Sequence, residues 1–499
     1  MKLKVQDCIL GAFLILAYFV TRLINLTIIP VFVDEAIYIR WAQVMRAVST
    51  LRFLPLSDGK QPLFMWLIMP FLKIFSDPLV AGRLVSVGAG LGTMVGIFTL
   101  SLLLFKKKEV AFLGAILYLI SPFTFFFDRL ALADGLLSFF GIWVIVGAVG
   151  LAKEKRLDLA MITGVLLGLG LITKSPALFF ALLLPTTIIL NGRMMMRPYN
   201  IVKLVFLWGV VYLFGFAIYN ILRLGPEFQM IAIRNKDYVF SFREVLSHPL
   251  NPFWGNLKSV IEWFWIFLTP LSFVSAITGG VLVLKRHLKE GGLLWLWLLI
   301  PLLGQSAIAK VYTARYILFT VPIFLIFAAY LLWKIFSSLK SRWITTLVLI
   351  VFFVVPVYQI ALLLVNPQKA WLPKNERYGY LEIWTAGYGI KEAADYLREV
   401  AKKENVLVGT EGYFGTLPEG LQIYLEKTPR VTVIGLGEPV REISSKLTSG
   451  LVSNRVFLLV NDSRFMVSNR SNLRLIAKYP KAESREGKEN LLFFEVLAK

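Results

Sequence analysis

Apolar runs of about 20 residues recur along the chain, and they constrain the fold more than any other feature of the sequence. One of them is LVLIVFFVVPVYQIALLLV, residues 347–365. A helix of this length matches the thickness of the hydrocarbon core of a bilayer. Repetition of such runs predicts a polytopic α-helical membrane protein, and 57% hydrophobic residues agree with that class.

Hydropathy and length predict about eleven transmembrane helices. We expect them at residues 8–29, 79–105, 110–127, 135–152, 159–173, 175–191, 201–222, 259–284, 292–309, 315–336 and 343–365. The first run lacks a small-residue cleavage site, so it is predicted to be retained and not removed as a signal peptide. The apolar segment 62–75 is too short to cross, and we expect it to lie at the membrane interface.

Lysine and arginine gather at the ends of the predicted spans. The clusters that fall on one side are residues 106–108, 153–156, 285–289 and 338–342, and the group Arg193, Arg197 and Lys203. The positive-inside rule places these clusters and the N-terminus in the cytoplasm. A net charge of +22 would suggest nucleic acid for a soluble protein, but this distribution indicates membrane lipids and predicts no nucleic-acid partner. The protein is therefore predicted to be a multi-pass cell-membrane protein.

The chain changes character after its last apolar run. Apolar and amphipathic segments alternate there, with a predicted helix at 389–403 and predicted strands at 405–410, 430–436 and 455–462. This alternation predicts a small soluble α/β domain. The predicted domains are a transmembrane domain, residues 1–365, whose first outer loop is 30–78, and an extracytoplasmic α/β domain, residues 366–499.

Two adjacent carboxylates, Asp34 and Glu35, follow the first predicted span in the stretch FVDEAIYIRWAQ. Behind them Ile37 and Trp41 follow helical spacing, which predicts a helix lying on the outer membrane surface. Two interpretations of the acids remain open. Asp34 caps the helix, with Glu35 favoured in the first turn by the helix dipole, or the pair is catalytic.

Further charged and polar side chains map to the outer ends of the spans. They are Lys60 beside the interfacial segment, Asp128, Arg129 and Asp134 in FFFDRLALAD, Lys174 in TKSPAL, and Lys310, Arg315 and Tyr316 in KVYTARY. Taken singly, each has an ordinary interpretation as a snorkelling side chain or a surface ion pair. Charged groups at membrane depth are costly, however, and tend to mark function.

In this order the motifs resemble the GT-C class of membrane glycosyltransferases. The resemblance is greatest to the branch that holds the protein O-mannosyltransferases and the aminoarabinose transferase of lipid A, and it covers most of residues 1–330. The motifs are the acidic pair with its helix, VDEAIYIRWA; a KPPL-like element, GKQPLFMWL; an R-x4-D turn, DRLALAD; a TKG-like turn, TKSPAL; and RYILFTVP. Gln61 stands where a proline is usual and Ser175 where a glycine is usual, and neither departure removes a charged group.

The resemblance implies a function as well as a fold. The donor would be a sugar on dolichyl or undecaprenyl phosphate, and the acceptor a protein, a lipid or a glycan on the outer face. The implied roles are Asp34 as base, Glu35 as its orienting partner, Lys60, Lys174, Lys310 and Arg315 as cations that stabilise the leaving phosphate, Asp134 as a holder of a basic partner or the sugar, and Tyr316 as a contact of phosphate or sugar. One displacement by this route inverts the anomeric carbon.

Two alternatives stay open at this point. A divalent cation bound by the acidic pair occurs in the oligosaccharyltransferase branch of the class, but the sequence requires no cofactor and we favour no metal. A transporter or flippase of lipid-linked sugars is the alternative function, although it is expected to show internal repeats or matched broken helices, and we find no such symmetry. The basic outer loop with Arg234, Lys236 and Arg243 is predicted either to help bind phosphate or to attract anionic headgroups.

Overall fold

The computed structural model describes residues 4–191, 198–484 and 487–498, and the chain divides into two compact units. Unit 1 comprises Met1–Ile24, Arg52–Phe64 and Leu84–Pro373; unit 2 comprises Asn25–Leu51, Met65–Arg83 and Lys374–Lys499. Arg193 and Arg197, which belong to one predicted basic cluster, lie outside the described residues.

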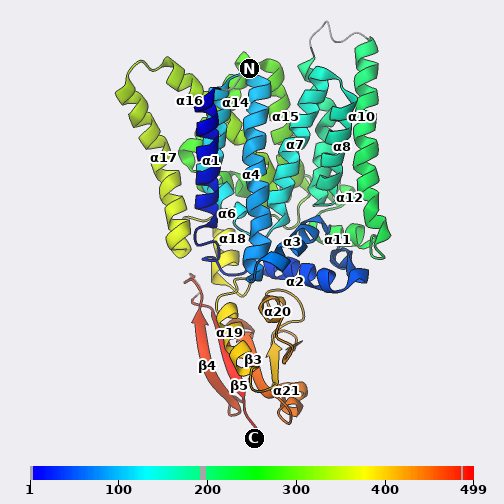
Figure 1. Ribbon diagram of the computed structural model, residues 1–499, viewed down its shortest axis with the longest axis vertical. Coiled ribbons are helices and arrows are strands. Elements are labelled where there is room, and N and C mark those ends of the chain that lie inside the picture. The colour runs from blue at the N-terminus through cyan, green and yellow to red at the C-terminus, as the bar shows by residue number, and fades with distance from the viewer. Residues whose placement is uncertain (1–3, 192–197, 485–486, 499) are drawn as a thin grey trace. The chain divides into compact units, whose positions relative to one another are not determined.

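Seven helical segments within the described residues are long and apolar enough to cross a membrane (Figure 1). They are Val5–Leu23 (α1), Pro78–Phe105 (α4), Ala133–Glu154 (α7), Pro198–Leu224 (α10 and the turn after it), Leu288–Ile308 (α15), Ala314–Ser338 (α16 and the turn before it) and Arg342–Val365 (α17). The predicted class of polytopic helical membrane protein is confirmed.

Two further apolar segments are sharply bent. Lys108–Ile120 (α5) and Pro122–Asp128 (α6) meet at 61°, and Phe253–Phe267 (α13) and Pro270–Arg286 (α14) meet at 113°. A proline opens the second helix of each pair, where its missing N–H costs no helical hydrogen bond. The predicted span 259–284 is thus not one straight helix. Counting each bent pair as one span gives nine, so the predicted count of eleven is not confirmed.

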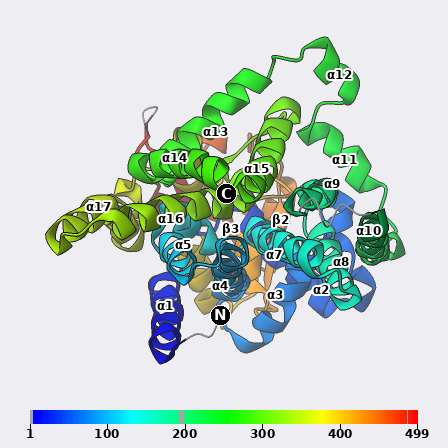
Figure 2. The same cartoon turned by 90° about the horizontal axis from the view of Figure 1, so that it is seen from above.

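The remaining predicted spans are shorter apolar helices. Leu157–Leu171 (α8) packs between α7 and α10, as Figures 1 and 2 show. Helices α8 and α10 pack closely at Gly164. A Cβ at this position would lie 2.8 Å from the carbonyl oxygen of Val211, which is too near for a larger residue. The segment Ser175–Leu190, which contains Leu178–Leu183 (α9), completes this group. Small residues at such crossings let membrane helices pack by van der Waals contact.

Unit 2 contains the predicted α/β fold. Its strands are Val406–Thr410 (β1), Val431–Gly435 (β2), Arg455–Asn461 (β3), Leu473–Pro480 (β4) and Asn490–Val496 (β5), in the order β2-β1-β3-β5-β4. The strands β1, β2 and β3 are parallel, and β5 is antiparallel to β3 and β4. The helices of this domain are Ile390–Val400 (α19), Glu419–Leu425 (α20) and Ser445–Gly450 (α21). The three predicted strands are confirmed, whereas β4 and β5 were not predicted.

The helix Val33–Ala47 (α2) belongs to unit 2, together with most of Leu63–Ile74 (α3). Gln43 Nε2 of α2 donates 2.9 Å to the carbonyl oxygen of Ile423 in α20. Arg46 forms a half-buried ion pair of 2.8 Å with Glu426. Helix α2, which the sequence assigned to the membrane domain, therefore contacts α20 and the residue after it.

Candidate active site

Glu35 accepts three hydrogen bonds at the N-terminal end of α2. Its carboxylate accepts two hydrogen bonds from Arg83, of 2.8 Å from Nε and 2.7 Å from Nη2, and both side chains are fully buried. The backbone N–H of Phe32 donates a third bond of 3.0 Å to the same carboxylate. Glu35 thus satisfies an N–H at the helix start.

Arg83 also fixes the chain that leads into α2. Its Nη1 donates to the carbonyl oxygens of Leu26 and Ile29 at 2.7 and 2.9 Å, and its Nη2 donates to that of Pro30 at 3.1 Å. A bidentate guanidinium–carboxylate pair with this many further bonds holds a rigid geometry. The position of Asp34 therefore depends on Arg83, a residue that the sequence analysis did not single out.

Asp34 itself is half-buried and occupies the first turn of α2. Glu35 is held in a buried ion pair with Arg83, which suits proton abstraction poorly, so Asp34 stays the predicted base. The catalytic role of either acid stays a prediction.

In unit 1, Lys174 and Asp134 form an ion pair. Lys174 Nζ lies 2.5 Å from Asp134 Oδ1, and Asp134 is buried while about a fifth of the Lys174 side chain is exposed. The ammonium also lies over the ring of Tyr316, 4.1 Å from its centroid, and the guanidinium of Arg315 lies 5.4 Å from the same centroid. Four predicted donor-binding residues thus come together, and cation–π contact holds the two cations near one ring.

Lys174 stands in the turn between α8 and the next helical segment. Burial lowers the pKa of its ammonium to about 8, with Arg315 and Lys60 acting in the same direction and Asp134 opposing them. A cation whose neighbours include two like charges is favoured when an anion binds among them. The local arrangement therefore suits a phosphate group.

The two departures from the family pattern lie side by side in unit 1. Gln61 Nε2 donates a hydrogen bond of 2.8 Å to Ser175 Oγ. Neighbouring Lys60 donates 2.9 Å to the hydroxyl of Tyr238, over whose ring it lies at 4.3 Å. The bond between Gln61 and Ser175 joins the KPPL-like and TKG-like motifs directly.

Lys310 has different neighbours. Its Nζ donates 2.8 Å to the carbonyl oxygen of Lys236 in Met230–Tyr238 (α11), and it lies 5.0 Å from the ring centroid of Phe240. In the same loop Arg234 pairs with Asp58 at 2.8 Å and with Asp237 at 2.7 Å. The charge that the loop offers to phosphate is therefore partly neutralised, and Lys310 is held by the loop itself.

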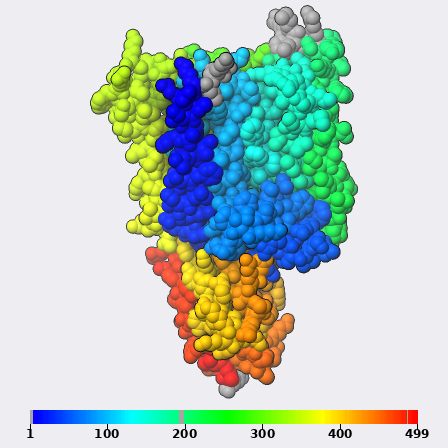
Figure 3. All heavy atoms as spheres, viewed as in Figure 1, coloured from blue at the N-terminus to red at the C-terminus, as the bar shows by residue number. Residues whose placement is uncertain are grey.

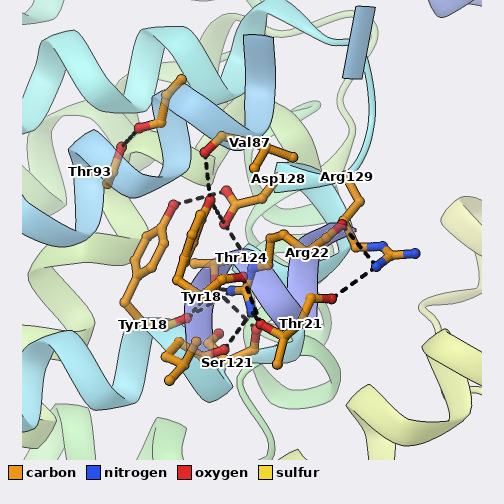
Figure 4. A network of polar contacts seen from close by, with 12 residues as sticks. Tyr18, Thr21, Arg22, Val87, Thr93, Tyr118, Ser121, Thr124, Asp128 and Arg129 are labelled. Atoms are coloured by element: carbon orange, nitrogen blue, oxygen red, sulfur yellow. Dashed lines mark hydrogen bonds and ion pairs between the residues drawn. The ribbon is translucent and has the colours of Figure 1, made fainter. Parts of the chain in front are cut away.

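A buried polar network lies where α1, α5 and α6 meet, and Figure 4 shows it. Asp128 accepts hydrogen bonds from Tyr18 at 3.1 Å and Tyr118 at 2.9 Å, and Arg22 Nε lies 3.4 Å from it. Arg129 donates to the carbonyl oxygens of Thr21, Arg22 and Ile24, at the C-terminal end of α1. These hydrogen bonds join α1, α5 and α6. In the sequence, the network was indicated only by charged residues inside an apolar run.

Residues 59–219 match the family model described as dolichyl-phosphate-mannose-protein mannosyltransferase, a segment that includes Lys60, Asp134 and Lys174. ArnT from Cupriavidus metallidurans in the apo state matches with a TM-score of 0.58 and 14% identity over 97% of both chains. The chain has the GT-C fold.

A second structure of ArnT from Cupriavidus metallidurans, bound to undecaprenyl phosphate, matches with a TM-score of 0.57, 14% identity and the same 97% coverage of both chains. The S. cerevisiae Pmt1-Pmt2 complex bound to the sugar donor matches with a TM-score of 0.39 and 20% identity over 46% of this chain and 35% of that chain. No curated protein sequence matches the chain. The GT-C resemblance predicted from five short motifs is confirmed.

Proposed function

We propose that this protein is a glycosyltransferase that moves a sugar from a polyprenyl-phosphate donor to an acceptor hydroxyl on the outer face of the membrane. One observation carries the proposal: Lys174, Asp134, Tyr316 and Arg315 form one cluster in a chain with the GT-C fold. Cations positioned against an aromatic ring and a buried carboxylate suit such a donor, which has an anionic phosphodiester and sugar hydroxyl groups.

The donor follows from the same comparisons. The family model that matches residues 59–219 is named for dolichyl-phosphate-mannose, and one ArnT structure holds undecaprenyl phosphate. Both lipids present a phosphate at the end of an isoprenoid chain, so we infer the shared chemistry of a polyprenyl phosphate. The sugar, and the choice among protein, lipid and glycan acceptors, are left open.

The proposed reaction begins at Asp34. Its carboxylate takes the proton of the acceptor hydroxyl as the oxygen attacks the anomeric carbon of the donor. The new bond joins the acceptor oxygen to that carbon, and the bond from the carbon to the phosphate oxygen breaks. A single displacement of this kind inverts the anomeric configuration. Glu35, held by Arg83, acts in this scheme by fixing where Asp34 stands.

The leaving group is a polyprenyl phosphate, which departs with the electron pair of the broken bond. It needs no proton from the protein, because a phosphate is a stable anion at neutral pH. Its growing charge requires nearby cations, a role that suits Lys174 and Arg315, with Lys60 as the next cation. We propose that Lys310 contributes less, because it is bonded to the backbone of Lys236.

A divalent cation at the acidic pair fits this chain poorly. Glu35 has both carboxylate oxygens engaged by Arg83, and one of them also accepts the N–H of Phe32. A cation would have to displace a buried guanidinium to use Glu35. We therefore derive no step through a metal.

The decisive experiment follows the donor. Purified protein in lipid nanodiscs is given a polyprenyl-phosphate sugar labelled in both the sugar and the lipid, together with a crude envelope fraction as acceptor. We expect release of free polyprenyl phosphate and movement of sugar label into the acceptor, with neither product formed by a Lys174→Ala variant. In proteoliposomes, labelled lipid-sugar that moved intact between leaflets would instead indicate a flippase, a function that no observation favours.

The same proposal predicts sidedness. We propose that the first outer loop and the C-terminal domain are extracytoplasmic and that the N-terminus is cytoplasmic. Single cysteines at positions 34 and 174, in a chain with Cys8 replaced by serine, should react with a membrane-impermeant maleimide from the same side. Labelling from opposite sides would exclude the mechanism.

A further inference from the structure

A groove of about 560 Å³ lies within unit 2, away from Asp34. Its walls are formed by α2, the end of α3 and the residues that follow it, α19, and α20 with the loop after it. Gln43 contributes the α2 side, and at 1.5 Å per residue it stands about 14 Å further along that helix than Asp34. The groove therefore belongs to the same compact unit as the proposed base but is separate from it.

The groove carries an excess of positive charge. Five basic side chains line it, namely Lys391, Arg398, Lys402, Lys427 and Arg430, against the three acids Asp77, Asp395 and Glu426. The acids are already engaged, since Asp77 pairs with Lys391 at 2.6 Å, Asp395 with Arg398 at 2.6 Å and Glu426 with Arg46 at 2.8 Å. The remaining charge is therefore cationic.

Lys402 pairs with Glu399 at 2.6 Å, so Lys427 and Arg430 hold that remaining charge. Both are exposed, and among the described residues neither has a carboxylate within ion-pair distance. Thr428 lines the groove between them, so the stretch Lys-Thr-Pro-Arg offers an ammonium, a hydroxyl and a guanidinium along one rim. These are the donors that proteins use for phosphate oxygens.

Apolar side chains also line the groove. Leu72 and Phe75, from α3 and its C-terminal end, belong to the lining, and Ile74 next to Phe75 in sequence is 73% exposed. Exposed apolar side chains on a helix that is too short to cross a bilayer are typical of an interfacial segment. Cationic and apolar side chains in one groove match an amphiphile that has an anionic headgroup and acyl chains better than a soluble anion.

We propose that this groove binds the anionic phosphate headgroup of a membrane phospholipid, with Lys427, Thr428 and Arg430 contacting the phosphate and Phe75 facing the chains. The exposed surface of α19, coloured yellow in Figure 3, forms one wall. The site is independent of the sugar donor and stands whether or not the protein transfers sugar.

The test uses the full-length protein in detergent, titrated with phosphatidylglycerol or phosphatidylcholine, with bound lipids counted by native mass spectrometry. The variant is Lys427→Glu with Arg430→Glu. Each basic residue near an anionic surface contributes about fivefold to binding, so reversing two charges should weaken phosphatidylglycerol binding more than tenfold, as an order-of-magnitude estimate. Binding of zwitterionic phosphatidylcholine should not change.

The matched control is Arg441→Glu with Lys446→Glu. These residues are also exposed cations of unit 2, and neither lines the groove. The control makes the same change in net charge, so it should retain wild-type phosphatidylglycerol binding. An equal loss of phosphatidylglycerol binding in both variants would show that the effect comes from net charge alone, and it would overturn the proposed site. Retention of phosphatidylglycerol by the Lys427 and Arg430 variant would overturn it too.

Two further titrations separate the possible occupants. Inorganic phosphate at a concentration equal to that of the lipid should displace little phosphatidylglycerol, because it lacks acyl chains to contact Phe75. An acidic peptide that displaced the lipid at equal concentration would identify a polypeptide site and overturn the lipid assignment. Both variants should unfold at the same temperature as the wild type, since substitutions of exposed residues rarely cost much stability.

Discussion

Gln61 and Ser175 bind each other: the Gln61 amide donates a 2.8 Å hydrogen bond to the Ser175 hydroxyl. They are also the two positions at which this chain departs from the motifs of the class it resembles, where proline and glycine are usual. The two departures from the motif pattern are therefore in direct contact.

A double-mutant cycle tests this relationship. We expect Gln61→Ala or Ser175→Ala to weaken donor binding by about 1 kcal/mol, because each removes the hydrogen bond that joins the chain beside Lys60 to the chain beside Lys174. The double variant should lose little more than either single one, since the two side chains act as a unit. The measurement is the KM for the lipid-sugar donor. Strictly additive losses would show that the two side chains act separately.

Arg83 should be indispensable for unit 2. In Arg83→Ala the fully buried Glu35 carboxylate loses its counter-charge, and breaking such a pair lowers the free energy of unfolding by about 3–5 kcal/mol. Thermal unfolding in detergent gives the readout, with Arg46→Ala as control. The pair of Arg46 with Glu426 is only half-buried, unlike the fully buried pair of Arg83 with Glu35, so its loss should cost only about 1 kcal/mol.

A second variant separates charge from packing at this position. Arg83→Met combined with Glu35→Met removes both charges and should recover much of the stability lost in Arg83→Ala. It should not recover transfer activity, because the bonds to the carbonyl oxygens of Leu26, Ile29 and Pro30 are lost as well. Full activity in the double variant would mean that the position of Asp34 does not depend on Arg83.

Asp34→Asn should abolish transfer and leave the fold intact. The substitution keeps the size of the side chain but removes the base, while Glu35 still satisfies the N–H at the helix start. The cost to stability should stay within about 1 kcal/mol, the range for an acid in a first helical turn. Turnover of labelled donor is measured beside the melting temperature. A variant that turns over like the wild type would remove Asp34 as the base.

Activity should fall at alkaline pH through Lys174. Burial lowers the pKa of this ammonium to about 8, so the cation is present below that pH and is lost as the pH rises through it. The KM for the donor should therefore increase above about pH 8, whereas kcat at saturating donor should change less, because bound phosphate favours the protonated form. In Lys174→Arg the guanidinium stays charged throughout, so this increase in KM should disappear. If KM in Lys174→Arg still increased above about pH 8 as in the wild type, another titrating group would be responsible for the increase.

A chelator should leave transfer unaffected. Both Glu35 oxygens are bound to Arg83, so a divalent cation could use Glu35 only by displacing a buried guanidinium. Turnover measured after dialysis against EDTA should match turnover in added Mg²⁺ or Mn²⁺ within about a factor of two, a difference below 0.5 kcal/mol. Loss of activity on dialysis and its return with either ion would contradict this prediction.

Much of the membrane architecture was predictable because hydropathy is a local property. Lengths of apolar runs placed α1, α4, α7, α10, α15, α16 and α17 close to their observed bounds, and the short length of segment 62–75 predicted that α3 would not span. The strands β1, β2 and β3 were also visible as apolar runs between turns. Hydropathy does not show where a helix axis changes direction. The 113° bend before Pro270 was therefore missed inside the predicted span 259–284.

The sequence by itself determined that the chain is a membrane protein of GT-C type with an α/β domain, since burial in lipid and in a sheet core is encoded in neighbouring residues. Only the tertiary structure decided which charges meet. Glu35 and Arg83 are separated by 48 positions, and Arg22 and Asp128 by 106, so no periodicity connects them. Such pairs form because helix packing removes water from both partners at once, and a buried charge is stable only where the fold supplies its counter-charge.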